Sequence, residues 1–438
     1  MDFLLIILYC AFPFVIWRLM VASRVRFSKI TIPSILIIAM FLITYIGILP
    51  LYLGWDRYRY AAGVQDKVLI FKLFVHACES ILGLALGFCV AKYFTRKSLF
   101  ESHKEAFMPL KLMQKYFLMV FFLFCIAITY LYLTKIPKLA IAVVIKDGLQ
   151  AAQKARSQMG NNFPGKYHWY MLFMHHVLYF LVWSLLANWL LTKKKIDFLL
   201  FFCAFPFAVF TSIMATEKAP LCGLIVGCIL TYLITLKKGH FKVLFCMGAL
   251  ALLSIILAVF YQNFMGTVTF SKSILSAMSR FFCGELHTAY YYLDFFPKHH
   301  DFLMGRSFPN PRGWIPFEPY NIPINLKNHY FPDLTHSGIV GSAPTVFWGE
   351  IYANFGPAFI FIGSLLVGIY IYLISHFVNK LANTPIKAGL LAWLALHYAT
   401  LTVTGIASFI FDFYLFITVG IALFLIFVGY KGNSQQTT

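Results

Sequence analysis

The chain has 438 residues, of which 61% are hydrophobic and only 12% are charged. An ordinary soluble domain carries about a quarter charged residues, so the composition excludes that class. The formal net charge of +20 is compatible with nucleic-acid binding, but basic residues also collect in the cytoplasmic loops of membrane proteins and set their orientation, so we expect no nucleic-acid partner.

Apolar windows long enough to cross a bilayer of about 30 Å follow one another along most of the chain. They predict an all-α integral membrane protein, with about eleven transmembrane helices in one polytopic domain over residues 1–438. The predicted spans cover about residues 3–22, 30–54, 68–93, 116–134, 169–191, 196–216, 220–237, 243–265, 352–376 (with a start anywhere within 346–352), 388–403 and 406–429.

Basic residues mark alternate loops and predict the orientation. They gather at about residues 24–29, 96–115, 193–195, 237–242 and 380–387. The excess of basic residues in cytoplasmic loops places the N-terminus outside and the C-terminus inside. Residues 135–167 then form an outer segment that is amphipathic at helical spacing, and we expect it to lie along the membrane surface. Residues 266–345 form a large outer loop.

The large outer loop and the re-entry after it concentrate titratable side chains. These are Arg280, Glu285, Arg306, Arg312, His336 and Glu350. The loop has about as many acidic as basic groups, so orientation does not explain its arginines. Guanidinium groups suit phosphate oxygens. We therefore predict that several outer cations bind one lipid pyrophosphate, namely Arg280, Lys218, Arg156, Arg306 and Arg312. The alternative is that each pairs with a nearby acid or with lipid head groups.

Two residues are candidates for the proton-accepting group. His336 precedes the re-entry, and a histidine near its ordinary pKa of about 6.5 can act as a general base. Glu350 lies at the mouth of an apolar helix, where partial desolvation would raise the pKa of its carboxyl. The alternatives are a surface-loop histidine and an acid favoured by the helix dipole.

Three further residues of the re-entry are candidates for binding sugar, namely Trp348, Tyr352 and Asn354. Aromatic faces stack on sugar rings, and the polar tips of tyrosine and asparagine donate hydrogen bonds to sugar hydroxyls. Aromatic residues are also common at membrane interfaces for purely structural reasons. Both interpretations stay open from the sequence.

Four ionisable residues fall inside predicted spans. His76 and Glu79 lie one helical turn apart in the third span, and His397 and Asp412 lie in the last two. Such groups are costly in a membrane and often functional. A proton relay would use them, but the set is sparse, so we favour a structural network between helices.

The sequence has no nucleotide cradle, zinc signature or serine-nucleophile motif, so we expect no cofactor and no metal. A nucleotide sugar is then an unsuitable donor. A lipid-linked donor is consistent with an enzyme that works at the outer face.

Short motifs and the layout of spans resemble the O-antigen and capsule repeat-unit polymerases of the Wzy type. The motifs are TEKAPL at 216–221 and HSGIVGSAPTVFWGEIYANFGP at 336–357. The layout includes the amphipathic outer segment that ends near Arg156. The resemblance implies a polymerase/ligase architecture similar to GT-C glycosyltransferases, in the bacterial inner membrane, with its active site facing the periplasm.

The resemblance also implies the reaction and the partners. The growing glycan would pass from undecaprenyl pyrophosphate to the newest lipid-linked repeat unit, without metal. Membrane lipids and a chain-length regulator protein are the other implied partners. Three alternatives remain: an O-antigen ligase that transfers glycan to lipid A core, a flippase for lipid-linked oligosaccharides, and a membrane O-acyltransferase that uses His397.

Overall fold

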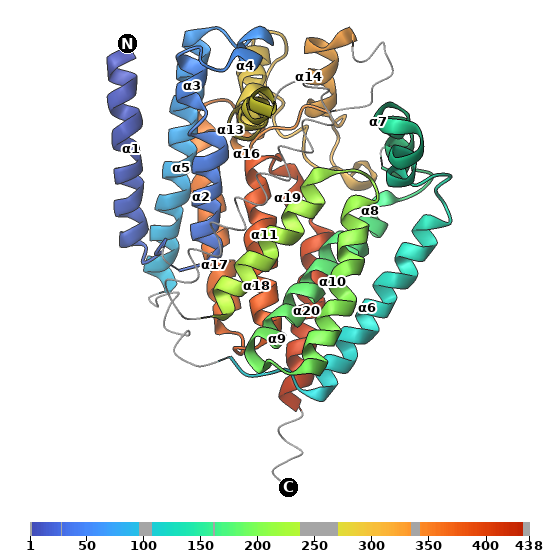
Figure 1. Cartoon of the computed structure of the whole chain (residues 1–438). Helices are drawn as coiled ribbons and strands as arrows, with labels where there is room; N and C mark the ends of the chain where they lie inside the picture. Colours follow the sequence, from blue (N-terminus) through green and yellow to red (C-terminus); the bar gives the residue numbers. More distant parts are fainter. Residues whose placement is uncertain are drawn as a thin grey trace. The chain divides into compact units, whose positions relative to one another are not determined.

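The computed structural model describes residues 2–27, 29–95, 107–160, 163–236, 270–333 and 342–431, and throughout these ranges the chain forms helices and connecting segments without strands (Figure 1). Nine helical segments in this part of the chain are long and apolar enough to cross a membrane. They are Phe3–Ala22, Ile32–Tyr52, Lys67–Thr95, Leu112–Leu133, Tyr167–Thr192, Lys195–Ile213, Lys218–Thr235, Ala358–Lys380 and Ala407–Gly429. The prediction of a polytopic helical membrane protein is confirmed.

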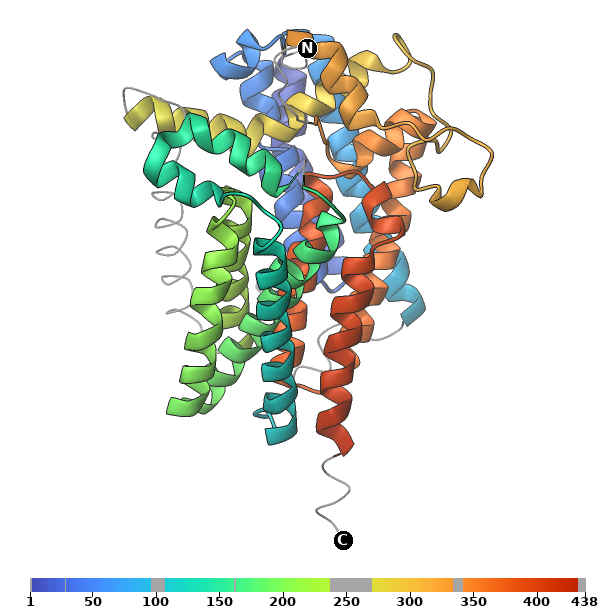
Figure 2. The same ribbon diagram turned by 90° about the vertical axis from the view of Figure 1, so that its right-hand side faces the viewer.

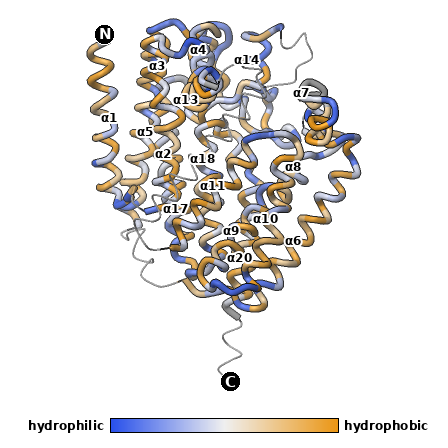
Figure 3. The backbone as a smooth tube through the Cα atoms, in the orientation of Figure 1, coloured by the Kyte–Doolittle hydropathy of each residue, from blue (hydrophilic) through white to orange (hydrophobic). Residues whose placement is uncertain are grey.

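The nine segments coincide with nine of the predicted spans, and Figure 3 shows hydrophobic residues along their lengths. The predicted span 243–265 lies outside the described residues. The predicted span 388–403 corresponds to the shorter helix α18 (Pro385–Ala399, 15 residues) and the 3-10 turn η4 (Thr400–Thr402). A total of about eleven spans therefore stays a prediction.

The chain divides into two compact units. Unit 1 comprises Met1–Glu101, Tyr261–Phe377 and His397–Asp412, and unit 2 comprises Ser102–Phe260, Val378–Leu396 and Phe413–Thr438. Each unit thus collects segments that are distant in the sequence. The predicted single domain over 1–438 stays a prediction.

Unit 1 contains the long helices and most of the large outer segment. Its elements are α1 (Asp2–Ala22), α2 (Ile32–Thr44), α3 (Ile48–Tyr52), α4 (Arg57–Ala61), α5 (Lys67–Thr95), α13 (Phe270–Phe295), η3 (Pro311–Gly313), α14 (Ile322–Tyr330), α16 (Phe347–Phe355), most of α17 (Ala358–Lys380), η4 and α19 (Ala407–Ile410). Within it, α13 lies across one end of the long helices (Figures 1 and 2). The short helices α3, α4 and α14 lie at the same end.

Residues 266–345 were predicted to form a large loop, but they include helix α13. With 26 residues, it is one of the longest helices of the unit. Buried residues recur along it every three or four positions, as at Ser276, Ser279, Cys283 and Leu286. That spacing produces one buried face. The helix packs on α2, α4, α5 and α16, so this part of the segment that was predicted to be outer is folded against the long helices of the unit.

Close helix packing in unit 1 depends on glycines of α5. A Cβ added to Gly83 would lie 2.7 Å from the carbonyl oxygen of Phe361, and one added to Gly87 would lie 2.3 Å from that of Leu365. Both carbonyls belong to α17. The two glycines are four residues apart, which is the small-residue spacing that lets membrane helices approach closely.

Unit 2 contains α6 (Leu112–Leu133), α7 (Ala140–Met159), α8 (Tyr167–Met171), the π-helical turn η2 (Leu172–Val177), α9 (Leu178–Thr192), α10 (Lys195–Ile213), α11 (Lys218–Thr235), most of α18 and α20 (Phe413–Lys431). Helix α7 falls within the predicted amphipathic segment 135–167 and lies across the ends of its neighbours (Figure 2). It bends at Gly148, whose φ of 82° suits glycine. The Tyr132 hydroxyl donates to the Met159 carbonyl and ties α6 to the end of α7.

Candidate functional site

Helix α16 forms the centre of the re-entry segment in unit 1. It carries Glu350 and Asn354 among mostly hydrophobic residues, and it ends at Gly356, which has a φ of 82° that a side chain disfavours. All residues from Phe347 to Asn354 are buried. The predicted site residues on this helix therefore face protein: Trp348 and Asn354 are 0% exposed, and Glu350 and Tyr352 are 7% exposed.

Glu350 connects three segments of unit 1. The Ser307 hydroxyl donates to its Oε1 at 2.6 Å, and the backbone N–H of Ala407 donates to its Oε2 at 2.9 Å. Burial raises the pKa of the carboxyl above its usual range, and these hydrogen bonds oppose the rise. Gly405 is required beside it, because a Cβ there would lie 2.0 Å from Oε2. Both carboxylate oxygens are thus occupied by protein donors.

Asn354 fixes the loop that follows α13. Its Oδ1 accepts from the Gly305 N–H at 3.0 Å, and its Nδ2 donates to the Ser307 hydroxyl at 2.7 Å and to the Glu350 carbonyl at 2.8 Å. The Tyr352 hydroxyl donates to the Phe296 carbonyl at 2.9 Å. The polar groups of both residues are already used by protein. Sugar binding by these two and Trp348 stays a prediction.

A second polar cluster lies where α13 meets α4. The Arg59 guanidinium donates to Nδ1 of His287 at 2.9 Å, and Nε2 of His287 lies 2.8 Å from the Tyr291 hydroxyl. That hydroxyl donates to the Ala62 carbonyl at 2.6 Å, so it accepts from Nε2–H. The ring is therefore neutral, with its proton on Nε2. Burial, followed by the charge of Arg59, lowers the pKa of His287 to about 4.

Glu285 is a carboxyl of this region with one buried oxygen, Oε2, that has no hydrogen-bond partner among the described residues. Burial raises its pKa to about 7, and the positive charges of Arg280 and Arg59 limit the rise. Arg280 itself is exposed on α13. A carboxyl that titrates near neutral pH beside guanidinium groups is a typical candidate for acid–base chemistry.

Tyr292 joins the two clusters. It is buried, and its hydroxyl donates weakly to the Ala343 carbonyl at 3.4 Å. Burial raises its pKa well above the usual range, and the negative charges of Glu350 and Glu285 add to the rise. The charges of both carboxyls therefore raise the pKa of the same phenol, at the place where α13 packs on α16. We call Arg59, Arg280, Glu285, Tyr292 and Glu350 the α13–α16 cluster.

Comparison with known protein families, curated proteins and solved structures gives no match.

The other predicted phosphate-binding residues divide between the units. In unit 1, Arg306 donates through Nε to the Glu318 carbonyl at 3.3 Å and lies over the Tyr320 ring at 5.9 Å. Arg312, also in unit 1, is exposed in η3. Because Arg306 precedes Ser307, its loop is held against Glu350. These two cations lie in the same predicted outer segment, 266–345, as Arg280.

The remaining two predicted phosphate-binding residues lie in unit 2. Arg156 is 3.6 Å from Glu217 in a half-exposed ion pair, which matches the alternative that it pairs with an acid. Lys218 begins α11, directly after that acid. The ion pair joins the two segments that were predicted to be outer. His336 lies outside the described residues.

Sequence reasoning assigned no role to Arg59, Glu285 or His287. Arg59 stood in a short segment that was interpreted only as a connection between spans, and its contact with His287 is 228 positions away along the chain. Glu285 was noted in the outer segment without a role. The 3.6-residue pattern of α13 was the available signal that its residues divide between a buried and an exposed face, but no local spacing placed Glu285 near Arg59.

The ionisable residues of the predicted spans form two pairs in unit 1. His397 lies 2.5 Å from Asp412, and His76 lies 2.9 Å from Glu79. His76 also lies 6.1 Å from the Trp348 ring and 5.7 Å from the Tyr352 ring. The His76–Glu79 pair lies within α5, whereas the His397–Asp412 pair joins α18 to the segment before α20. A structural network between helices therefore stays a prediction.

Proposed function

We propose that the chain is a membrane glycosyltransferase that polymerises lipid-pyrophosphate-linked oligosaccharide repeat units into O-antigen or capsular polysaccharide. The site would be the α13–α16 cluster, at the outer face of the bacterial inner membrane. The observation that carries the proposal is the half-buried carboxyl of Glu285, whose Oε2 accepts no hydrogen bond from the described residues. Burial raises its pKa to about 7, and the positive charges of Arg280 and Arg59 limit the rise. The resemblance of short motifs to Wzy-type polymerases adds the reaction class.

The chemistry needs one base and several cations. The acceptor hydroxyl attacks the anomeric carbon of the donor glycan, and the bond from that carbon to the pyrophosphate oxygen breaks. The electron pair leaves with the lipid pyrophosphate, where exposed Arg280 would stabilise the developing charge. The hydroxyl proton passes to the ionised carboxylate of Glu285.

Glu350 would act as a positioning residue in this scheme. Its oxygens are bonded to Ser307 and to the N–H of Ala407, so it holds the loop that carries Arg306 against α16. Arg306 would then reach the same anionic group from the loop. Cations held in place in a partly dehydrated site stabilise the charge of the transition state more than mobile cations do, because they need not move during the reaction.

A second function is favoured by one specific observation. The His397 ring and the Asp412 carboxylate are paired at 2.5 Å, and both side chains are almost fully buried. A histidine oriented by a carboxylate within a membrane protein is what a membrane O-acyltransferase requires. Such an enzyme would leave glycan length unchanged and alter only its acyl groups.

The test is the surface polysaccharide of a deletion strain complemented with wild type, Arg280→Ala or His397→Gln, separated by length on a gel. The polymerase proposal predicts a lipid core capped with a single repeat unit in the deletion and in Arg280→Ala, at normal protein levels. Accumulation of lipid-linked polymer with uncapped core would instead identify a ligase. Full-length chains that lack acyl groups in His397→Gln would favour the acyltransferase.

A further inference from the structure

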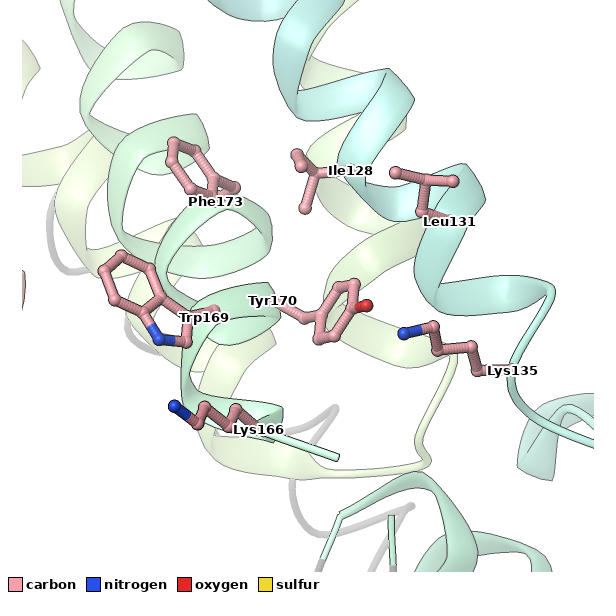
Figure 4. A pocket seen from close by; sticks show the side chains of 7 residues that line it. All are labelled: Ile128, Leu131, Lys135, Lys166, Trp169, Tyr170 and Phe173. Atoms are coloured by element: carbon pink, nitrogen blue, oxygen red, sulfur yellow. The ribbon is translucent and has the colours of Figure 1, made fainter. Parts of the chain in front are cut away.

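Unit 2 contains a cavity of about 350 Å³ between the end of α6 and the start of α8 and η2. Its lining comes from two stretches of chain on either side of α7, as Figure 4 shows. The lining residues are Ile128, Leu131, Lys135, Lys166, Trp169, Tyr170 and Phe173. None of them belongs to the α13–α16 cluster, and no function has been assigned to them above.

The lining changes from apolar to cationic along the cavity. Ile128 and Leu131 of α6 and Phe173 of η2 form the apolar part. Lys135 and Lys166 supply two ammonium groups, and the rings of Trp169 and Tyr170 lie between these and the apolar part. A site of this composition suits a molecule with a hydrocarbon tail and an anionic head.

Neither lysine is neutralised by a carboxylate in the part of the chain that the structure describes. The Lys135 ammonium lies 5.5 Å from the centre of the Tyr170 ring, which is a cation–π contact. Lys166 is exposed at the start of α8. Two ammonium groups on one small cavity repel each other, and an anion between them would remove that cost.

The cavity also lies at the level where a lipid head group is found. The membrane-spanning segment Leu112–Leu133 ends two residues before Lys135, and the segment Tyr167–Thr192 begins directly after Lys166. Tryptophan and tyrosine are enriched at this boundary between hydrocarbon and head groups. The apolar lining residues lie within the two spans and the lysines lie just outside them.

A π-helical turn beside the cavity is a second, independent indication of a functional site. Residues Leu172–Val177 form a π-helical turn inside an otherwise continuous helical segment, and Phe173 of that turn lines the cavity. Single π turns inside α-helices are frequent at functional sites, because the wider turn redirects side chains.

We infer that this cavity binds a lipid whose head group carries an anionic phosphate. The phosphate lies between Lys135 and Lys166, and the first part of the tail lies along Ile128, Leu131 and Phe173. The volume is near the lower end of the range for ligand sites, so it fits a head group and a few methylene groups. This inference does not depend on the proposed function.

The test is native mass spectrometry of the full chain, titrated separately with phosphatidylglycerol and with undecaprenyl pyrophosphate. The variant is Lys135→Ala/Lys166→Ala. Each lysine near a lipid phosphate contributes about fivefold to affinity, so we expect binding of at least one of these lipids to fall about 25-fold. The control is Lys138→Ala, which removes one positive charge from an exposed position three residues from Lys135 but outside the cavity.

The two lipids separate the sources of the phosphate. If the alanine variant loses binding of both lipids, the cavity is a general site for anionic lipid. If it loses binding of undecaprenyl pyrophosphate alone, the occupant is an isoprenoid carrier. The Lys135→Arg/Lys166→Arg variant should retain binding, which separates charge from folding. Equal binding of both lipids to wild type and to the alanine variant would overturn the inference, as would equal losses in Lys138→Ala.

Discussion

At the residue scale, two carboxyl groups of unit 1 differ in how many hydrogen bonds their oxygens accept. Glu350 is buried but receives hydrogen bonds on both oxygens, whereas Glu285 is half-buried and its Oε2 accepts none from the described residues. Hydrogen bonds stabilise the ionised form, and desolvation without them stabilises the neutral form. The first carboxyl is therefore suited to holding structure, and the second to exchanging a proton.

Substitution of Glu285 by glutamine should make stability less dependent on pH. The folded protein holds this proton with a pKa of about 7, against about 4.3 in an unfolded chain, so the free energy of unfolding falls as pH rises from about 4.5 to 7. Glutamine does not titrate, so the Glu285→Gln variant does not lose this stability as pH rises. Its melting temperature should exceed that of wild type at pH 8, and the difference should shrink towards pH 4.5.

The control for this melting experiment is Glu318→Gln, at an exposed carboxyl of the same predicted outer segment. This variant retains Glu285, so its melting temperature should fall between pH 4.5 and pH 8 as that of wild type does. A Glu285→Gln variant whose difference is the same at pH 4.5 and pH 8 would contradict the raised pKa.

The contact between Gly405 and Glu350 gives a second prediction. Gly405→Ala places a methyl group 2.0 Å from the current position of Oε2, so the carboxylate must leave the Ala407 N–H. We expect a loss of about 1–3 kcal/mol in the free energy of unfolding, as is usual for overpacked sites. Thermal melts in detergent would measure it. Gly420→Ala, where a Cβ meets nothing within 4 Å, is the control, and equal melting temperatures would disprove the close contact.

At the scale of elements, α13 organises the layer of helices at one end of unit 1. It crosses the ends of the long helices and carries Arg280, Glu285, His287 and Tyr292 on faces that reach α4 and α16. Its helical hydrogen bonds fix the spacing of these side chains more rigidly than a loop would. A site on such an element keeps its geometry while substrates enter from the membrane.

The close contact of α5 with α17 is testable at this scale. Gly87→Leu cannot be accommodated where a single Cβ already lies 2.3 Å from the Leu365 carbonyl, so the two helices must separate. We expect lower thermal stability and lower yield of folded protein, measured by size-exclusion chromatography after heating. Gly223→Leu, on α11 with open space at the Cβ, should behave as wild type. Equal losses in both variants would contradict the packing.

Length and hydropathy were sufficient to predict the spans. Nine of them recur as helices because about 18 apolar residues without charge have few alternatives in a membrane. The candidate site was less predictable. The contact of Arg59 with His287 and the joint action of Glu285 and Glu350 on Tyr292 depend on tertiary packing between distant segments. No local spacing encodes such contacts.

At the scale of the whole molecule, an enzyme that acts on a lipid-linked substrate must hold the lipid tail in the membrane and the reacting groups in water. Unit 1 combines long apolar helices with a polar layer at one end, where α3, α4, α13 and α14 gather (Figure 1). Lipid-linked glycans have the same division, with a tail in the membrane and sugars outside. This correspondence supports a substrate of that class.

The most direct test is polymerisation by the purified protein in nanodiscs, supplied with lipid-pyrophosphate-linked repeat units and analysed for product length. We expect chains longer than one repeat from wild type and from Lys272→Ala, a control on the exposed face of α13. Arg280→Ala and Glu285→Gln should lose at least about 100-fold in rate. The wild-type rate should rise as pH increases through about 7, because the carboxylate form accepts the proton. Unchanged rates in both site variants, or a rate that falls over this pH range, would contradict the proposed site.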